Sequence, residues 1–180
     1  MAPKWKPKTT WRAKLEQRHP GHGKVVTAPP RMASGRVDAS MLIPSPRKVD
    51  ALVREVPRRS IALIPDLRAR LARDAGAELA CPLTTGIFLK LVAETSEEDR
   101  AAAAAASGSG AVASAGSSGA HQPAPYWRLL KEGGALNPKF PGGAAQHASR
   151  LADEGHGIAA NRKGEPARVE GWEARQFLFD

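Results

Sequence analysis

The sequence predicts a mainly α domain with a helix-turn-helix-like arrangement, preceded by a basic tail without regular structure. Helical spacing of apolar residues begins near Arg47, and Pro and Gly residues divide the rest of the chain into short segments. Two short helices and a third, joined by tight turns, form such an arrangement. We expect a basic, disordered or extended tail at 1–40, one domain at 41–160 with an Ala/Gly/Ser-rich insertion at 101–124, and a C-terminal extension at 161–180.

The first expected helix starts near Arg47. Val49, Leu52, Val53 and Val56 occupy the i, i+3, i+4 and i+7 positions of an amphipathic helix. Pro57 then ends it, because proline lacks the N–H that a continuing helix needs.

Two more helices are expected before residue 101. Pro65 opens the second, and Gly76 ends it as a C-cap residue. Pro82 suits the first turn of the third, which we expect to reach about Arg100. That helix is predicted to bury Ile87, Phe88, Leu91 and Val92.

Residues 101–124 change composition to alanine and then to Ser-Gly repeats. We expect the alanines to prolong the third helix and the rest to be a disordered loop. Order returns at Pro125, with a turn at Gly133–Gly134 and a helix at about 144–154. The last segment, with Trp172 and Phe177 to Phe179, is predicted to close as a short helix.

Charge is concentrated at the N-terminus. Residues 1–36 hold nine Lys or Arg residues and one acid, Glu16, so they carry eight of the nine excess positive charges. With Trp5 and Trp11 interleaved, such an arm can bind phosphate backbones in a salt-sensitive way. We therefore expect binding to weaken when residues 1–36 are removed. The alternative is a solvated tail that only aids solubility.

Several classes of protein and site are excluded by composition. The sequence contains no run of eighteen apolar residues, so no transmembrane helix is predicted. Its single cysteine, Cys81, permits neither an internal disulfide nor a cysteine-based metal cluster. His19 and His22 have a His-x-x-His spacing but no further ligands in their Pro/Gly-rich surroundings. We expect no cofactor and no metal, a cytoplasmic, nucleoid-associated location, and a monomer.

The segment Pro125–Arg128 resembles the active-site motif of the alkylguanine-DNA alkyltransferases, Pro-Cys-His-Arg-Val, and a turn with Gly-x-Leu comes next in both. The resemblance covers roughly two-thirds of the chain. The chain is also similar to the alkyltransferase-like proteins, which lack the cysteine. The other matching segments are Arg47–Pro57 with the opening helix, 82–88 with the recognition helix, and 151–155 with the closing Leu-Leu-x-x-Glu-Gly. The resemblance implies a winged-helix-like DNA-binding domain.

The chemistry of that family is not expected here. Tyr126 replaces the nucleophilic cysteine and Trp127 the histidine, and an indole nitrogen cannot accept a proton. Only Glu154 matches the relay, and we interpret it as a surface or capping residue. Ile64 and Gly86 stand where the family carries the Tyr and Arg that extrude a base, so nucleotide flipping is not implied.

Candidate DNA contacts come from the same alignment. Thr84, Thr85 and Lys90 lie on the expected recognition helix, and Arg128 retains the family's arginine. For the two threonines helix capping is the alternative, for Lys90 a solvent-exposed position, and for Arg128 a structural role. A second set of candidates forms a base pocket at the former active site, Pro125, Tyr126 and Trp127, unless the two rings pack in the core.

The sequence thus predicts a non-catalytic protein that binds double-stranded DNA. The resemblance implies a sensor of alkylated or distorted DNA that recruits other repair proteins. Two alternatives stay open. One is an alkyl acceptor that uses Cys81, and the other is a module that binds RNA or protein.

Overall fold

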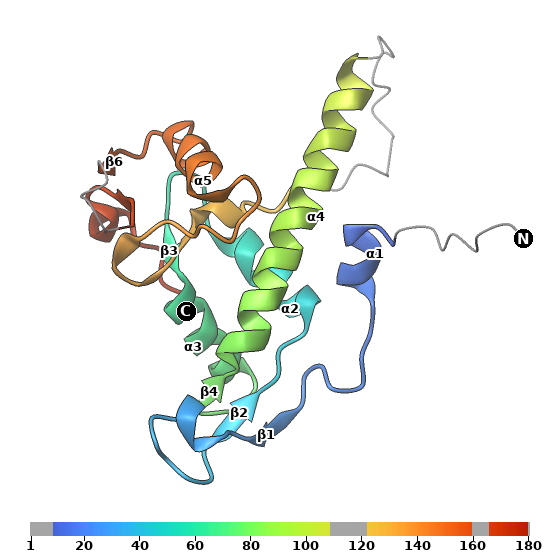
Figure 1. Ribbon diagram of the computed structural model, residues 1–180, viewed down its shortest axis with the longest axis vertical. Helices are drawn as coiled ribbons and strands as arrows, with labels where there is room; N and C mark the ends of the chain where they lie inside the picture. The colour runs from blue at the N-terminus through green and yellow to red at the C-terminus, as the bar shows by residue number, and fades with distance from the viewer. Residues whose placement is uncertain (1–8, 109–121, 160–165, 180) are drawn as a thin grey trace, which may run out of the picture.

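The computed structural model describes residues 9–108, 122–159 and 166–179, and their fold is mixed α/β. Figure 1 shows a long central helix, α4 (Pro82–Gly108), with α1 (Trp11–Glu16) on one side and α5 (Gly143–Ala152) on the other. The prediction of a mainly α, helix-turn-helix (winged-helix-like) domain is wrong, because short strands alternate with the helices along the chain.

The strands are two or three residues long and form three small sheets. In the largest, β2 (Ser40–Leu42) lies between β1 (Val25–Thr27), which is antiparallel to it, and β4 (Leu79–Ala80), which is parallel. The other two sheets are a parallel pair and an antiparallel pair: β3 (Ala62–Leu63) with β5 (Leu129–Leu130), and β6 (Ile158–Ala159) with β7 (Arg168–Val169). Strands this short contain no alternation of polar and apolar residues from which to predict them.

Residues 9–40 contain a helix, a strand and a 3-10 helix, where a disordered or extended tail was expected; residues 1–8 of that expected tail lie outside the described residues. Thr10 caps α1 by accepting a hydrogen bond from the backbone N–H of Ala13, and Leu15 is buried against the core. Arg12 joins α1 to α4 through a backbone hydrogen bond to Glu98, 3.0 Å, and an ion pair with Asp99. A short 3-10 helix, η1 (Pro30–Met32), comes after β1.

The two helices expected after residue 45 are confirmed. α2 (Pro46–Glu55) begins after Ser45, whose hydroxyl accepts from the N–H of Lys48, and Val49 and Val53 on it are buried. α3 (Ile64–Asp74) buries Leu67 and Leu71 in the same core.

α4 begins at Pro82 as expected, and the alanines prolong it to Gly108, so its C-terminal end projects past the other labelled elements (Figure 1). Of the four residues expected to be buried, Val92 is buried and Phe88 and Leu91 are half-buried against the core, whereas Ile87 is 55% exposed. Leu89, which was not predicted, is buried as well. The Ser/Gly repeats after residue 108, expected to be a loop, lie largely outside the described residues. None of the described helices is long and apolar enough to span a membrane.

The C-terminal part is built from short elements. Three 3-10 helices, η2 (Tyr126–Arg128), η3 (Glu132–Gly134) and η4 (Trp172–Arg175), connect its strands with α5. The expected closing helix is therefore only η4. The chain after it runs back along the core, where the N–H of Phe177 donates to the carbonyl of Ile61 and Phe179 is buried.

Candidate nucleic-acid interface

Tyr126 lies fully inside the core. Its hydroxyl donates a 2.9 Å hydrogen bond to Glu97 on α4, and its ring makes edge contacts with Trp127 and Phe140. Burial, and then the neighbouring carboxylate, raises the pKa of Tyr126. Pro125, half-buried, comes just before η2. Because no base can reach a fully buried ring, this segment packs as core and is not an open base pocket.

Trp127 and Glu154 form a buried polar pair. The indole Nε1 donates to Glu154 Oε1 at 2.8 Å, and Trp127 is 8% exposed. Glu154 is 7% exposed, so the interpretation as a surface or capping residue is wrong. Trp127, expected at the histidine position, thus contacts Glu154, expected at the relay glutamate position, but through a group that cannot accept a proton.

The guanidinium of Arg128 makes its hydrogen bonds to groups within the protein. It donates to both oxygens of Glu154 at 2.8 to 3.0 Å and to the carbonyl of Val56 at 2.7 Å. Burial alone would raise the pKa of Glu154, but hydrogen bonds from Arg128, the backbone of Arg59 and Trp127 outweigh it and lower the pKa. Arg128 therefore holds α2, η2 and the end of α5 together. This is the structural role that the sequence offers as the alternative to a DNA contact.

His147 is a further buried residue of this region that the sequence did not single out. Its Nδ1 accepts from the N–H of Asn137 at 3.0 Å, and its Nε2 donates to the carbonyl of Trp127 at 2.7 Å. Burial lowers the pKa of His147 to about 4, so the ring is neutral. No local pattern points to it, since both partners lie on other segments of the chain.

The two threonine hydroxyls in the first turn of α4 form hydrogen bonds with the backbone at the start of the same helix. Thr85 is fully buried and donates to the carbonyl of Cys81 at 2.7 Å, and the half-buried Thr84 donates to the same oxygen at 3.4 Å. Neither hydroxyl therefore has its proton free for a phosphate. Cys81 itself is buried in a small cluster with Met41.

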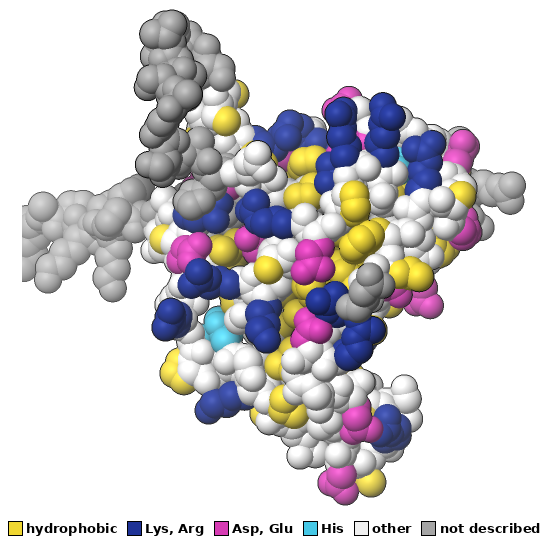
Figure 2. Space-filling view, turned by 180° about the vertical axis from the view of Figure 1, so that it is seen from behind, with side chains coloured by type: hydrophobic (Ala, Val, Ile, Leu, Met, Phe, Trp, Pro, Cys, Tyr) yellow, Lys and Arg dark blue, Asp and Glu magenta, His cyan; other side chains and the backbone are white. Residues whose placement is uncertain are grey.

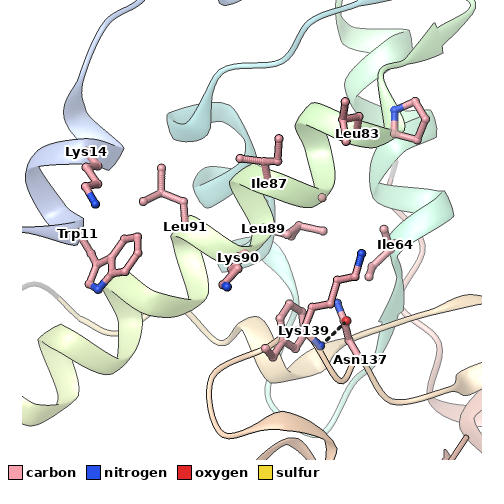
Figure 3. A pocket seen from close by; sticks show the side chains of 13 residues that line it. Trp11, Lys14, Ile64, Leu83, Ile87, Leu89, Lys90, Leu91, Asn137 and Lys139 are labelled. Atoms are coloured by element: carbon pink, nitrogen blue, oxygen red, sulfur yellow. Dashed lines mark hydrogen bonds between the residues drawn. The ribbon is translucent and has the colours of Figure 1, made fainter.

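Lys90 is exposed and belongs to a groove of about 530 Å³ on α4. Figure 3 shows α4 crossing this groove, with Trp11 and Lys14 of α1 on one side and Asn137 and Lys139 on the other. The residues that line it, hereafter the α4 groove, are Trp11, Lys14, Ile64, Pro82, Leu83, Gly86, Ile87, Leu89, Lys90, Leu91, Asn137, Lys139 and Phe140.

The lining of the α4 groove combines apolar side chains with positive charge. Three of the described residues that line it are lysines and none of these residues is acidic. Leu83 is 62% exposed and Ile87 55%, so two large apolar side chains of α4 face outward at the groove. By contrast, the face in Figure 2 carries Lys and Arg side chains with Asp and Glu between them.

A second hollow, of about 280 Å³, continues the α4 groove past Gly86. The two share Ile64, Gly86, Asn137 and Lys139, and the second adds the side chains of Arg68, Lys131 and Glu132. A Cβ at Gly86 would meet no atom within 4 Å, so the missing side chain leaves open space where the two hollows meet.

His19 and His22 lie near each other beside α4, with ring centroids 5.3 Å apart, and His22 packs edge-on against Phe88. Burial and then the neighbouring His19 lower the pKa of His22. Within residues 9–108, 122–159 and 166–179, no group of three or more His, Cys, Asp or Glu side chains could hold a metal ion.

The structure therefore divides the candidate residues into two sets. Lys90 lies in the α4 groove, whereas Thr85, Tyr126, Trp127 and Arg128 are turned into the protein. Comparisons with known proteins add no family to this picture: no family model matches the chain, and neither the curated proteins nor the solved structures contain a match.

Proposed function

We propose that this chain is a non-catalytic DNA-binding protein that places the α4 groove against double-stranded DNA. The observation that carries the proposal is the lining of the groove, which, within the described part of the chain, has three lysines and no carboxylate around an exposed helix face. Such a surface attracts a polyanion, because each ammonium group that meets a phosphate releases a bound counterion.

The exposed apolar residues of α4 suit the same partner. Leu83 and Ile87 stand one helical turn apart, and Lys90 lies further along the same helix. Proteins that bind the DNA minor groove insert apolar side chains between base steps while lysines hold the flanking phosphates. DNA that is distorted or alkylated opens such a step at lower cost, which supports a role as a damage sensor in repair.

The absence of catalysis is part of the proposal. Tyr126 is fully buried with its hydroxyl bonded to Glu97, and Trp127 cannot act as a base. The alternative acceptor, Cys81, is buried as well, and reactive thiols are partly exposed. Incubation with alkylguanine DNA should leave the mass of the intact protein unchanged. A mass increase that disappears in Cys81→Ser would establish an alkyl acceptor instead.

Fluorescence anisotropy with a labelled duplex tests the DNA proposal. Lys90→Gln and Lys139→Gln should each weaken binding, and each should reduce the slope of log K against log salt by about 0.9, as expected for one lost phosphate contact. Lys48→Gln is the matched control, since Lys48 is exposed on α2 and does not line the groove.

Competition between nucleic acids, one of them carrying a damaged base, completes the experiment. A duplex with one alkylguanine, an unmodified duplex and a structured RNA are compared with the same labelled probe. Tighter binding of the modified duplex supports damage sensing. Preference for RNA, or no affinity for any nucleic acid, contradicts the proposal and favours the RNA or protein module that the exposed Trp11, Leu83 and Ile87 would also suit.

A further inference from the structure

The walls of the α4 groove are not equivalent. One is formed by α1, which contributes Trp11 and Lys14, and the other by the loop with Asn137 and Lys139 (Figure 3). Lys14 Nζ lies 4.2 Å from the centroid of the Trp11 ring, and Trp11 is 38% exposed. The Lys14 ammonium thus lies against one face of the partly exposed Trp11 ring at one end of the groove.

α1 is held in place by contacts that do not involve the groove. Leu15 is buried, the backbone N–H of Arg12 donates to Glu98, and the Arg12 guanidinium pairs with Asp99. Trp11 therefore stands as a fixed wall and does not need to be ordered by a ligand, which reduces the entropy lost on binding.

The volume and chemistry of the α4 groove select among anionic occupants. At about 530 Å³ it has the size of a small-ligand site and is too small to enclose a double helix. Its lysines lie on three elements, Lys14 on α1, Lys90 on α4 and Lys139 on the loop, around mainly apolar side chains. A nucleic-acid strand offers that combination, since its bases stack on aromatic rings and its phosphates pair with cations.

We propose that the α4 groove binds unpaired nucleotides, with one base stacked on Trp11 and the backbone running past Lys90 toward Lys139. The inference rests on the proposed DNA binding and deepens it, because it names the form of DNA that the site takes. The preferred ligand is a duplex with an unpaired stretch, whose paired part lies against the surface around the groove.

The test compares three labelled DNAs on the full chain by anisotropy: a closed duplex, the same duplex with a few unpaired thymidines at its centre, and oligothymidylate. The interrupted duplex should bind about tenfold more tightly than the closed one. Trp11→Ala should remove most of that difference, and Trp11→Phe should retain it, because phenylalanine still stacks.

Two further readouts keep the result independent of the folding of α1. Gly86→Glu places a carboxylate at an open position on the groove floor and should weaken binding of the interrupted duplex about tenfold. Ala51→Glu, an equal charge change at an exposed position on α2, should leave it unchanged. An iodouracil in the unpaired stretch should crosslink to Trp11, as located by mass spectrometry of the digest.

Each outcome separates this inference from the proposed function. Equal affinity for closed and interrupted duplexes, unaltered in Trp11→Ala, overturns the inference and leaves duplex binding in place. No affinity for any of the three DNAs overturns both. Binding of polyglutamate with no binding of DNA also overturns both, and identifies the α4 groove as a site for acidic peptides.

Discussion

At the scale of single residues, Glu154 links separate segments of the chain through its hydrogen bonds. Its carboxylate accepts hydrogen bonds from Trp127, Arg128 and the backbone of Arg59, and its side chain and that of Arg128 are 7% and 13% exposed. An ion pair this buried is weakened little by solvent screening, and removing one partner leaves a charge without compensation.

Glu154→Gln should therefore lower the free energy of unfolding by about 3 kcal/mol, as measured by urea denaturation. The matched control is Asp50→Asn, which removes the carboxylate of a more exposed pair with Arg54 on α2 and should cost less than about 1 kcal/mol. Similar losses in the two variants would contradict the role assigned to Glu154.

At the scale of elements, α1 changes the interpretation of the N-terminal charge. The sequence suggested a free basic arm, but Arg12 pairs with Asp99 and Arg36 with Glu78, so part of the charge is neutralised within the fold. Removing residues 1–36 would delete α1, β1 and η1, and is therefore not a test of charge alone.

Leu15→Ala tests whether α1 belongs to the core. It should lower the free energy of unfolding by about 3 kcal/mol, because it leaves a cavity between α1, α2 and α4. Leu83→Ala makes the same change on the exposed face of α4 and should alter stability by less than about 0.5 kcal/mol. Thermal and urea unfolding measure both, and a harmless Leu15→Ala would show that α1 is only loosely attached.

At the scale of the whole molecule, stability should depend on pH through His147, which connects the loop at Asn137, the backbone of Trp127 and α5. In the unfolded chain a histidine titrates near 6.5, and burial lowers the pKa of His147 to about 4. Between these values the unfolded state binds more protons than the folded one at this residue, so the stability that depends on His147 is fully present above pH 6.5 and is lost as the pH falls toward 4.

The loss from pH 6.5 to pH 4 should be on the order of 3 kcal/mol from this residue. Urea denaturation at a series of pH values measures it, and His147→Gln should show a flatter profile over that window, since glutamine does not titrate. An unchanged slope in His147→Gln would mean that other groups, such as the buried His156 whose pKa is also lowered by burial, dominate the acid sensitivity.

The sequence by itself determined the helices after residue 45 and the distribution of charge. Val49, Val53 and Leu67 lie where helical spacing placed them, and Pro82 begins α4, because helix periodicity and proline chemistry act within a few residues. Only the tertiary structure decided the fold class and the candidate site. The strand pairs, the bonds of Glu154 and His147, and the α4 groove join segments far apart in sequence, and no local pattern encodes such contacts.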